Sequence, residues 1–126
     1  MPSPAPPDPT EDELSELLEG FLRHEVDAYY RVRFELPSEE PELCWRLIEV
    51  ARKGDLSEKQ LAVVSAGPFE DLMSVRGEQF IERVEAEARR DPKMRFLLGT
   101  VWRGKMSATV WDRVQRLRTT LGIRQL

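Results

Sequence analysis

The sequence predicts an all-α fold, a single domain of about six or seven short helices packed as αα-hairpins. Apolar residues recur at spacings of three and four along most of the chain, which is the helical period. Helix-capping residues stand in front of several of these runs. No Asn-Gly or Asp-Gly pair marks a β-hairpin, and 126 residues suffice for one core.

The sequence predicts a disordered N-terminal segment followed directly by a helix. Residues 1–9 alternate Pro with small or acidic residues, which predicts a disordered tail before a domain at residues 10–126. Thr10 is a good N-cap, and Glu13 three residues later completes a capping box. The apolar face that follows predicts one helix reaching Tyr29.

A change of pattern separates the first helix from the second. Residues 32–36 alternate apolar and polar side chains, and Pro37 is expected to stop regular structure there. Ser38 is then expected to begin a second helix, with Gly54 as its C-terminal cap. Five later helices are expected, approximately over Ser57–Ser65, Pro68–Gly77, Gly77–Ala88, Pro92–Gly99 and Ser107–Gly122.

The corner at Gly67 and Pro68 is predicted to be a structural hinge between two helices. Gly67 would supply the bend, Pro68 the first helical residue, and Glu70 a cap in the first turn. Phe69 and Leu72 are expected in the core, and Trp102 is expected to pack nearby.

Charge and composition limit the function classes. Residues 1–88 carry a net charge of -12 and residues 89–126 a net charge of +8. Such halves either attract each other or attract a partner. No apolar run is long enough for a membrane span, and no signal peptide is seen, so a cytoplasmic location is expected. With His24 and Cys44 as the single His and Cys, no metal site, no nucleophile set and no cofactor is predicted.

One group of charged residues is the candidate interaction site. It comprises Glu70, Asp71, Glu82, Arg83, Glu85 and Asp91. Two i,i+4 pairs, Arg83 with Glu87 and Glu85 with Arg89, are expected on one exposed helix face. The leading hypothesis is a non-catalytic domain, adaptor-like or immunity-like, that binds another protein. An enzyme that uses clustered carboxylates as acid and base is an alternative, and no oligomeric state is predicted.

The first alternative to the leading hypothesis, ahead of the enzyme, is nucleic-acid binding through the basic C-terminal helices. Residues 94–121 can be interpreted as a helix-turn-helix whose last helix carries Arg113, Arg116 and Arg118. These side chains would contact phosphates. The connection from Gly99 to Lys105 is longer than the usual turn of that motif.

Residues 65–111 resemble a bacterial family of unknown function. Its pattern is A-G-P-L-E-D-L, a Gly, F-I-D-R-I-E, D-P-R-F and a V-W pair. The matching residues here are 66–72, Gly77, 80–85, 91–94 and the pair Val101 and Trp102, with mild departures at Phe69, Glu82, Val84 and Met94. The resemblance implies a helical domain and no known activity.

Overall fold

A computed structural model describes residues 7–125 of the chain, and among these residues every regular element is a helix. The predicted all-α fold is confirmed. Residues 1–6 of the expected N-terminal tail lie outside the described residues. The elements in order are α1 (Glu11–Leu22), α2 (Val26–Tyr30), the π-helix η1 (Arg31–Glu35), α3 (Leu36–Glu39), α4 (Pro41–Lys53), α5 (Glu58–Val64), the π-helix η2 (Ser65–Phe69), α6 (Glu70–Arg90), α7 (Pro92–Thr100) and α8 (Ala108–Thr120).

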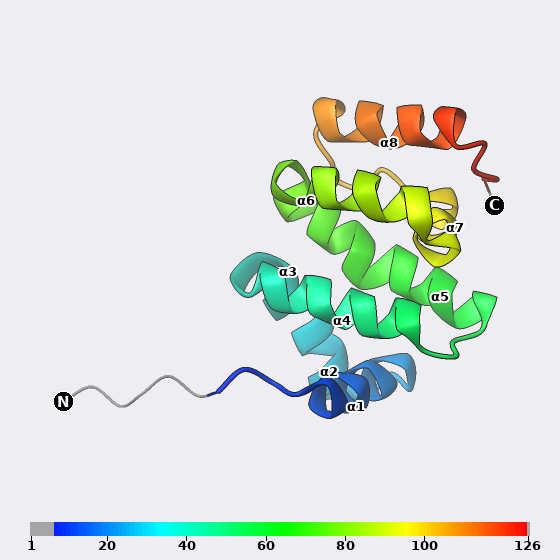
Figure 1. Cartoon of the computed structure of the whole chain (residues 1–126). Coiled ribbons are helices and arrows are strands. Elements are labelled where there is room, and N and C mark those ends of the chain that lie inside the picture. Colours follow the sequence, from blue (N-terminus) through cyan, green and yellow to red (C-terminus); the bar gives the residue numbers. More distant parts are fainter. Residues whose placement is uncertain (1–6, 126) are drawn as a thin grey trace.

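The helices form tiers that follow the order of the chain (Figure 1). The first tier, α1 and α2, packs against α4, and α4 packs against α5 and α6. The last tier, α8, lies on α6 and α7 at the opposite end of the molecule from α1. The basic part of the chain, which forms α7 and α8, therefore packs against the last helix of the acidic part, α6, and lies away from α1 and α2.

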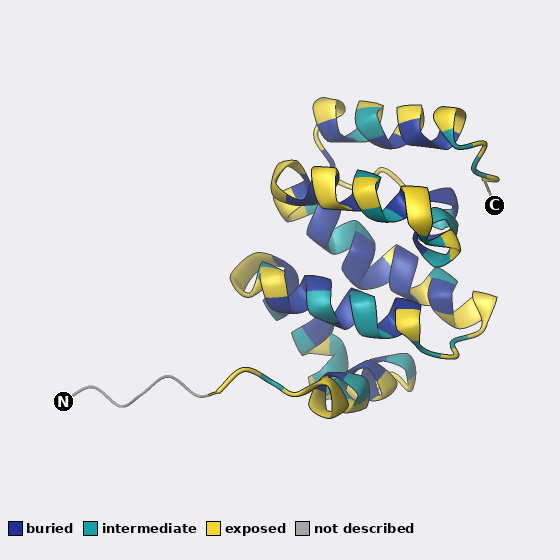
Figure 2. Ribbon diagram, viewed as in Figure 1, coloured by how far each residue is buried: buried dark blue, intermediate teal, exposed yellow. Residues whose placement is uncertain are grey.

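One continuous apolar core runs through all tiers (Figure 2). Its largest fully buried side chains include Phe21 of α1, Phe69 of η2 and Phe80 of α6. Because most of these helices are too short to be stable alone, the shared core supplies most of their stability.

The first predicted helix is wrong in its length. It ends at Leu22, and the chain reverses through His24, whose φ is 61°. A separate helix, α2, then begins at Val26. Gly20 permits this hairpin, because a Cβ there would lie 2.9 Å from the Cβ of Ala28. The spacing of apolar residues misled because Val26 fits the apolar period of α1 but is 81% exposed on α2, whereas Tyr29 packs on Phe21 of α1.

The predicted stop at Pro37 and start at Ser38 are also wrong. The chain stays helical through α2, η1 and α3, with Pro37 in the first turn of α3. A first-turn N–H has no partner within its own helix, so the ring of proline fits there. The hydroxyl of Ser38 donates to the Phe34 carbonyl at 2.8 Å. The next helix, α4, has Glu40 at its N-cap position and no side-chain capping hydrogen bond.

The predictions of local caps are confirmed. Thr10 with Glu13 and Ser57 with Gln60 form complete capping boxes. Side chains of Asp91 and Ser107 cap α7 and α8, and Gly54 caps the end of α4.

The predicted corner is partly confirmed. Gly67 breaks the helix with φ −105° and ψ −109°, and Phe69 and Leu72 are fully buried. The prediction for Glu70 is wrong, because its carboxylate interacts with the Trp102 backbone and no side chain caps α6. Trp102 itself is 77% exposed.

The predicted boundary at Gly77 is one residue late and is a bend within α6. Arg76, at φ −129° and ψ 23°, leaves the helical conformation while the helix label continues to Arg90. Gly77 is buried because α8 crosses there, where a Cβ would lie 2.8 Å from a Val110 methyl group.

No helix within residues 7–125 combines the length and the apolar character required to cross a bilayer.

Substitution of Gly67 by Val is expected to lower the free energy of unfolding by about 1–3 kcal/mol through overpacking. A Cβ at this position would lie 2.9 Å from Cζ of Phe21 and 3.3 Å from Cδ of Arg33. Thermal unfolding of the variant beside the wild type measures the loss. Ala66→Val, at the exposed neighbouring position, serves as the control. An unchanged melting temperature for Gly67→Val would contradict the close packing.

Candidate functional site

Two of the predicted interaction residues, Arg83 and Glu85, join α6 to other helices. Arg83 of α6 forms a bidentate pair with Glu42 of α4, at 2.6 and 2.7 Å. Glu85, two residues later, binds Arg113 of α8. The predicted i,i+4 pairs are therefore wrong, since both side chains reach across the fold. Glu82 is exposed beside them.

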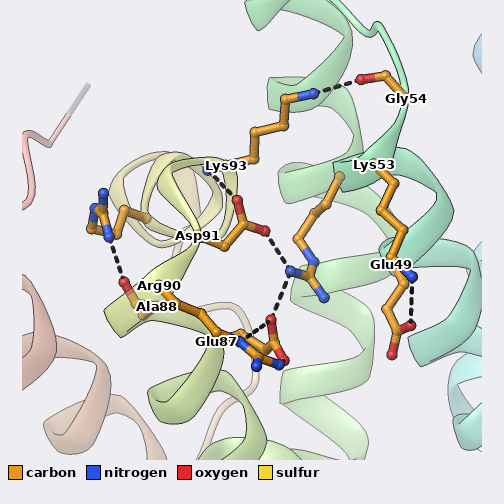
Figure 3. A network of polar contacts seen from close by, with 10 residues as sticks. Glu49, Lys53, Gly54, Glu87, Ala88, Arg90, Asp91 and Lys93 are labelled. Atoms are coloured by element: carbon orange, nitrogen blue, oxygen red, sulfur yellow. Dashed lines mark hydrogen bonds and ion pairs between the residues drawn. The ribbon is translucent and has the colours of Figure 1, made fainter.

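Asp91 belongs to a polar network at the junction of α6 and α7 (Figure 3). One of its oxygens accepts from the Lys93 backbone N–H at 2.9 Å, which caps α7. The other lies 2.5 Å from Nη1 of Arg52, a side chain of α4 that is only 6% exposed. Nη1 of Arg52 also lies 3.2 Å from Glu87. This network links α4 to both later helices.

Glu70 and Asp71 are brought together with Arg33 of η1. Arg33 forms two hydrogen bonds with Asp71, at 2.5 and 3.3 Å, and its Nη1 donates to the Tyr29 hydroxyl at 3.0 Å. Burial raises the pKa of Asp71, although Arg33 opposes the shift. Burial, followed by the charge of Asp71, raises the pKa of Glu70. This is the one place where two predicted site carboxylates are neighbours with raised pKa values.

The three arginines of the nucleic-acid alternative have different surroundings. Arg118 is buried, donates to the carbonyls of Leu98 and Val101, and its burial lowers its pKa. Arg113 is held by Glu85. Arg116 is 75% exposed and pairs with Asp112 on its own helix. Of the three arginines, Arg116 is thus the one with a mostly solvent-exposed side chain.

The structure also has an exposed apolar stripe that the sequence analysis does not predict. Val26, Tyr30 and Phe34 lie at i, i+4 and i+8 along α2 and η1, with exposures of 81%, 56% and 58%. The rings of Tyr30 and Phe34 contact each other, with centroids 5.3 Å apart. We call these three residues the aromatic stripe. The signal was present in the sequence, but Val26 was assigned to a buried face.

The aromatic stripe lies beside the group formed by Arg33, Glu70 and Asp71, which we call the Arg33 site. Tyr29 and Arg33, each next in sequence to a stripe residue, form the adjoining helix face. Tyr29 packs on Phe21 of α1, and Arg33 binds Asp71 of α6. Val75, 55% exposed, lies one turn after Asp71 on α6. The stripe and the ion pair of Arg33 with Asp71 therefore start from adjoining faces of one helical segment.

The described residues offer little for metal or thiol chemistry. Within residues 7–125 no three or more His, Cys, Asp or Glu side chains are grouped so as to hold a metal ion. Cys44 is buried, and burial raises its pKa far above the usual range of a thiol.

A family model described as "Family of unknown function (DUF6869)" matches residues 24–122. The chain belongs to this family. The matched residues of this DUF6869 protein include the aromatic stripe, the Arg33 site and the Arg52 network, whereas α1 precedes them. No curated protein and no solved structure gives a significant match.

Replacement of Asp91 separates its two roles. Asp91→Asn keeps an oxygen that can cap α7 but removes the charge opposite Arg52, whereas Asp91→Ala removes both. We expect both variants to be destabilised, the Ala variant by about 1 kcal/mol more, as is usual for loss of an N-cap. Urea unfolding measures both. Equal stability of the Asn variant and the wild type would contradict a role for the ion pair.

Substitution of Glu70 by Gln is expected to raise stability at neutral pH. A carboxyl whose pKa is raised on folding stabilises the protein below its ordinary value of 4.5, and that contribution is lost as the pH rises through the folded-state pKa. Gln does not ionise, so the advantage of the variant should be present at pH 7 and vanish near pH 4, at about the unfolded-state pKa. Thermal unfolding across this range, with the exposed Glu82→Gln as control, measures it. A Gln variant less stable at pH 7 would contradict the assignment.

Proposed function

We propose that this DUF6869 protein is a non-catalytic domain that binds another protein through the surface around α2 and η1. The observation that supports it is the aromatic stripe. Contiguous apolar groups on a folded surface are typical of interaction sites, and aromatic side chains are enriched at the centres of such sites.

The surroundings of the stripe favour a preformed binding surface. The next face of the same helix is fixed by the Arg33 pair with Asp71 and by the stacking of Tyr29 on Phe21, with ring centroids 5.6 Å apart. A rigid helix presents its side chains without a large ordering cost on binding. Tyr30 adds a hydroxyl to an apolar ring, a combination common in binding hot spots.

The predicted charged candidates have a different part in this proposal. Arg83, Glu85 and Asp91 serve mainly to join helices, while Glu70 and Asp71 border the binding surface through Arg33. The interaction site predicted from the sequence, which consists of these five residues and Glu82, stays a prediction.

Two alternatives have less support. Acid–base catalysis would use Glu70 and Asp71, whose raised pKa values are the relevant observation. Nucleic-acid binding would rest on Arg116, since Arg113 and Arg118 are engaged within the fold.

The test is affinity capture from cells that make the chain, using the variant Tyr30→Ser/Phe34→Ser. Both side chains are exposed, so the domain should remain folded, with stability changed by about 0.5 kcal/mol or less per site. At least one protein captured by the wild type should be reduced about tenfold or more by the double variant, as for loss of hot-spot residues.

The matched control is Val63→Thr, which alters an exposed apolar residue on α5, away from the stripe. It should capture the same proteins as the wild type. Identical capture by the wild type and the double variant would refute the proposal.

A further inference from the structure

Two hollows meet on the flank of α2. One, of about 580 Å³, is lined by α1 and α2, and the other, of about 490 Å³, by residues 7–9 and the beginning of α4. Pro9, Arg31 and Leu43 line both hollows, so they form one continuous depression. We call it the acidic groove.

The charge of the acidic groove is strongly one-sided. Seven carboxylates and two guanidinium groups line it, and two of the carboxylates, Glu42 and Glu25, also pair with Arg83 and Arg23 from outside the groove, so carboxylates remain in excess. Both guanidinium groups already have partners, since Arg31 pairs with Glu35 and Glu40 and Arg46 donates to the Pro9 carbonyl at 2.9 Å. Glu16 and Asp27 are exposed on its rim. The groove therefore presents net negative charge to anything that enters it.

The floor of the groove is apolar. Leu14, Leu17, Ala28 and Leu43 contribute to the lining between α1 and α2. Lysine and arginine have aliphatic stems that pack on such a surface while their charged ends reach carboxylates at the rim. A groove with this lining is suited to long basic side chains.

The acidic groove and the aromatic stripe share one helical path. Asp27 and Arg31, which line the groove, each directly follow a stripe residue, Val26 and Tyr30. At 3.6 residues per turn, residues 27 and 31 form the face next to residues 26 and 30. A partner lying along α2 and η1 would thus meet apolar rings on one side and carboxylates on the other.

We propose that the acidic groove and the aromatic stripe together bind a basic amphipathic helix of a partner protein. The inference rests on the proposed function and adds the chemical class of the partner. Apolar residues at helical spacing would pack on the stripe, whose own repeat is i, i+4, i+8, and lysine or arginine residues on one flank would enter the groove. The excess of carboxylates selects a basic partner through charge complementarity.

The probe is a synthetic helical peptide of about 18 residues, long enough for five turns, composed of Leu on one face and Lys on the other. A second peptide has Glu in place of every Lys, and a third has the same composition as the first in an order that destroys the apolar face. Titration calorimetry with the full chain measures their affinities. The Leu/Lys helix should bind, and the other two should bind at least about tenfold more weakly.

Two charge variants locate the binding. The groove variant is Glu16→Gln/Glu25→Gln/Asp27→Asn. The control is Glu39→Gln/Glu58→Gln/Asp55→Asn, which removes the same number of charges from exposed positions outside the groove. The groove variant should lose about tenfold in affinity and the control about twofold or less, with folding of both checked by circular dichroism.

The outcomes separate this inference from the proposed function. If Tyr30→Ser/Phe34→Ser abolishes capture of a natural partner but both charge variants bind the Leu/Lys helix equally, the stripe is an interaction site and the basic-helix inference is overturned. Equal binding of the Glu peptide would also overturn it. A dimer of the chain that is lost on Tyr30→Ser/Phe34→Ser would identify a second copy as the occupant and would likewise overturn it.

Discussion

The buried guanidinium of Arg52 is the interaction on which the arrangement of the tiers depends. Its Nη1 contacts both Glu87 and Asp91, and its plane lies over Trp45, 5.7 Å from the ring centroid. A cation with so little exposure requires paired carboxylates, since an unpaired buried charge is strongly destabilising. Because Glu87 lies near the end of α6 and Asp91 at the beginning of α7, pairing with both carboxylates holds α4 against both helices. Because α4 also carries the first tier, the same contact positions α1 and α2 relative to the rest of the molecule.

Many charged side chains are paired with one another inside the fold, and this pairing determines which charged groups stay available to a partner. Arginines of α4, α6 and α8 are matched to carboxylates of other helices, as Arg83 is to Glu42 and Arg113 to Glu85. Exposed pairs of this kind add little stability individually, but they specify which helices are neighbours. The flank of α2 differs from these surfaces, because it combines exposed apolar side chains with a groove in which carboxylates outnumber guanidinium groups. That contrast is the physical basis for proposing a binding surface there.

The sequence predicted correctly those features that depend on interactions between residues close in the chain. It misled where a feature depends on contacts between distant residues. The caps at Thr10, Ser57 and Ser107 were predictable because their hydrogen bonds span three residues. The reversal at His24 was not, because a residue other than Gly with positive φ carries no pattern that distinguishes it. Long-range pairs such as Arg33 with Asp71 join residues 38 positions apart, and neither spacing nor propensity encodes them. The same limit explains the candidate site, since residue types suggested an exposed charged patch while the tertiary contacts of those residues join helices.

Native-state hydrogen exchange of the variant Arg52→Met tests the central claim most directly. If the Arg52 network holds the tiers together, loss of the cation leaves Glu87 and Asp91 adjacent and should lower protection by a common amount, about 3 kcal/mol, in the slowest amides of α4, α6 and α7. Exchange that accelerates only in the first turn of α7, with α4 and α6 unchanged, would contradict the claim and reduce Arg52 to a local partner of the Asp91 cap.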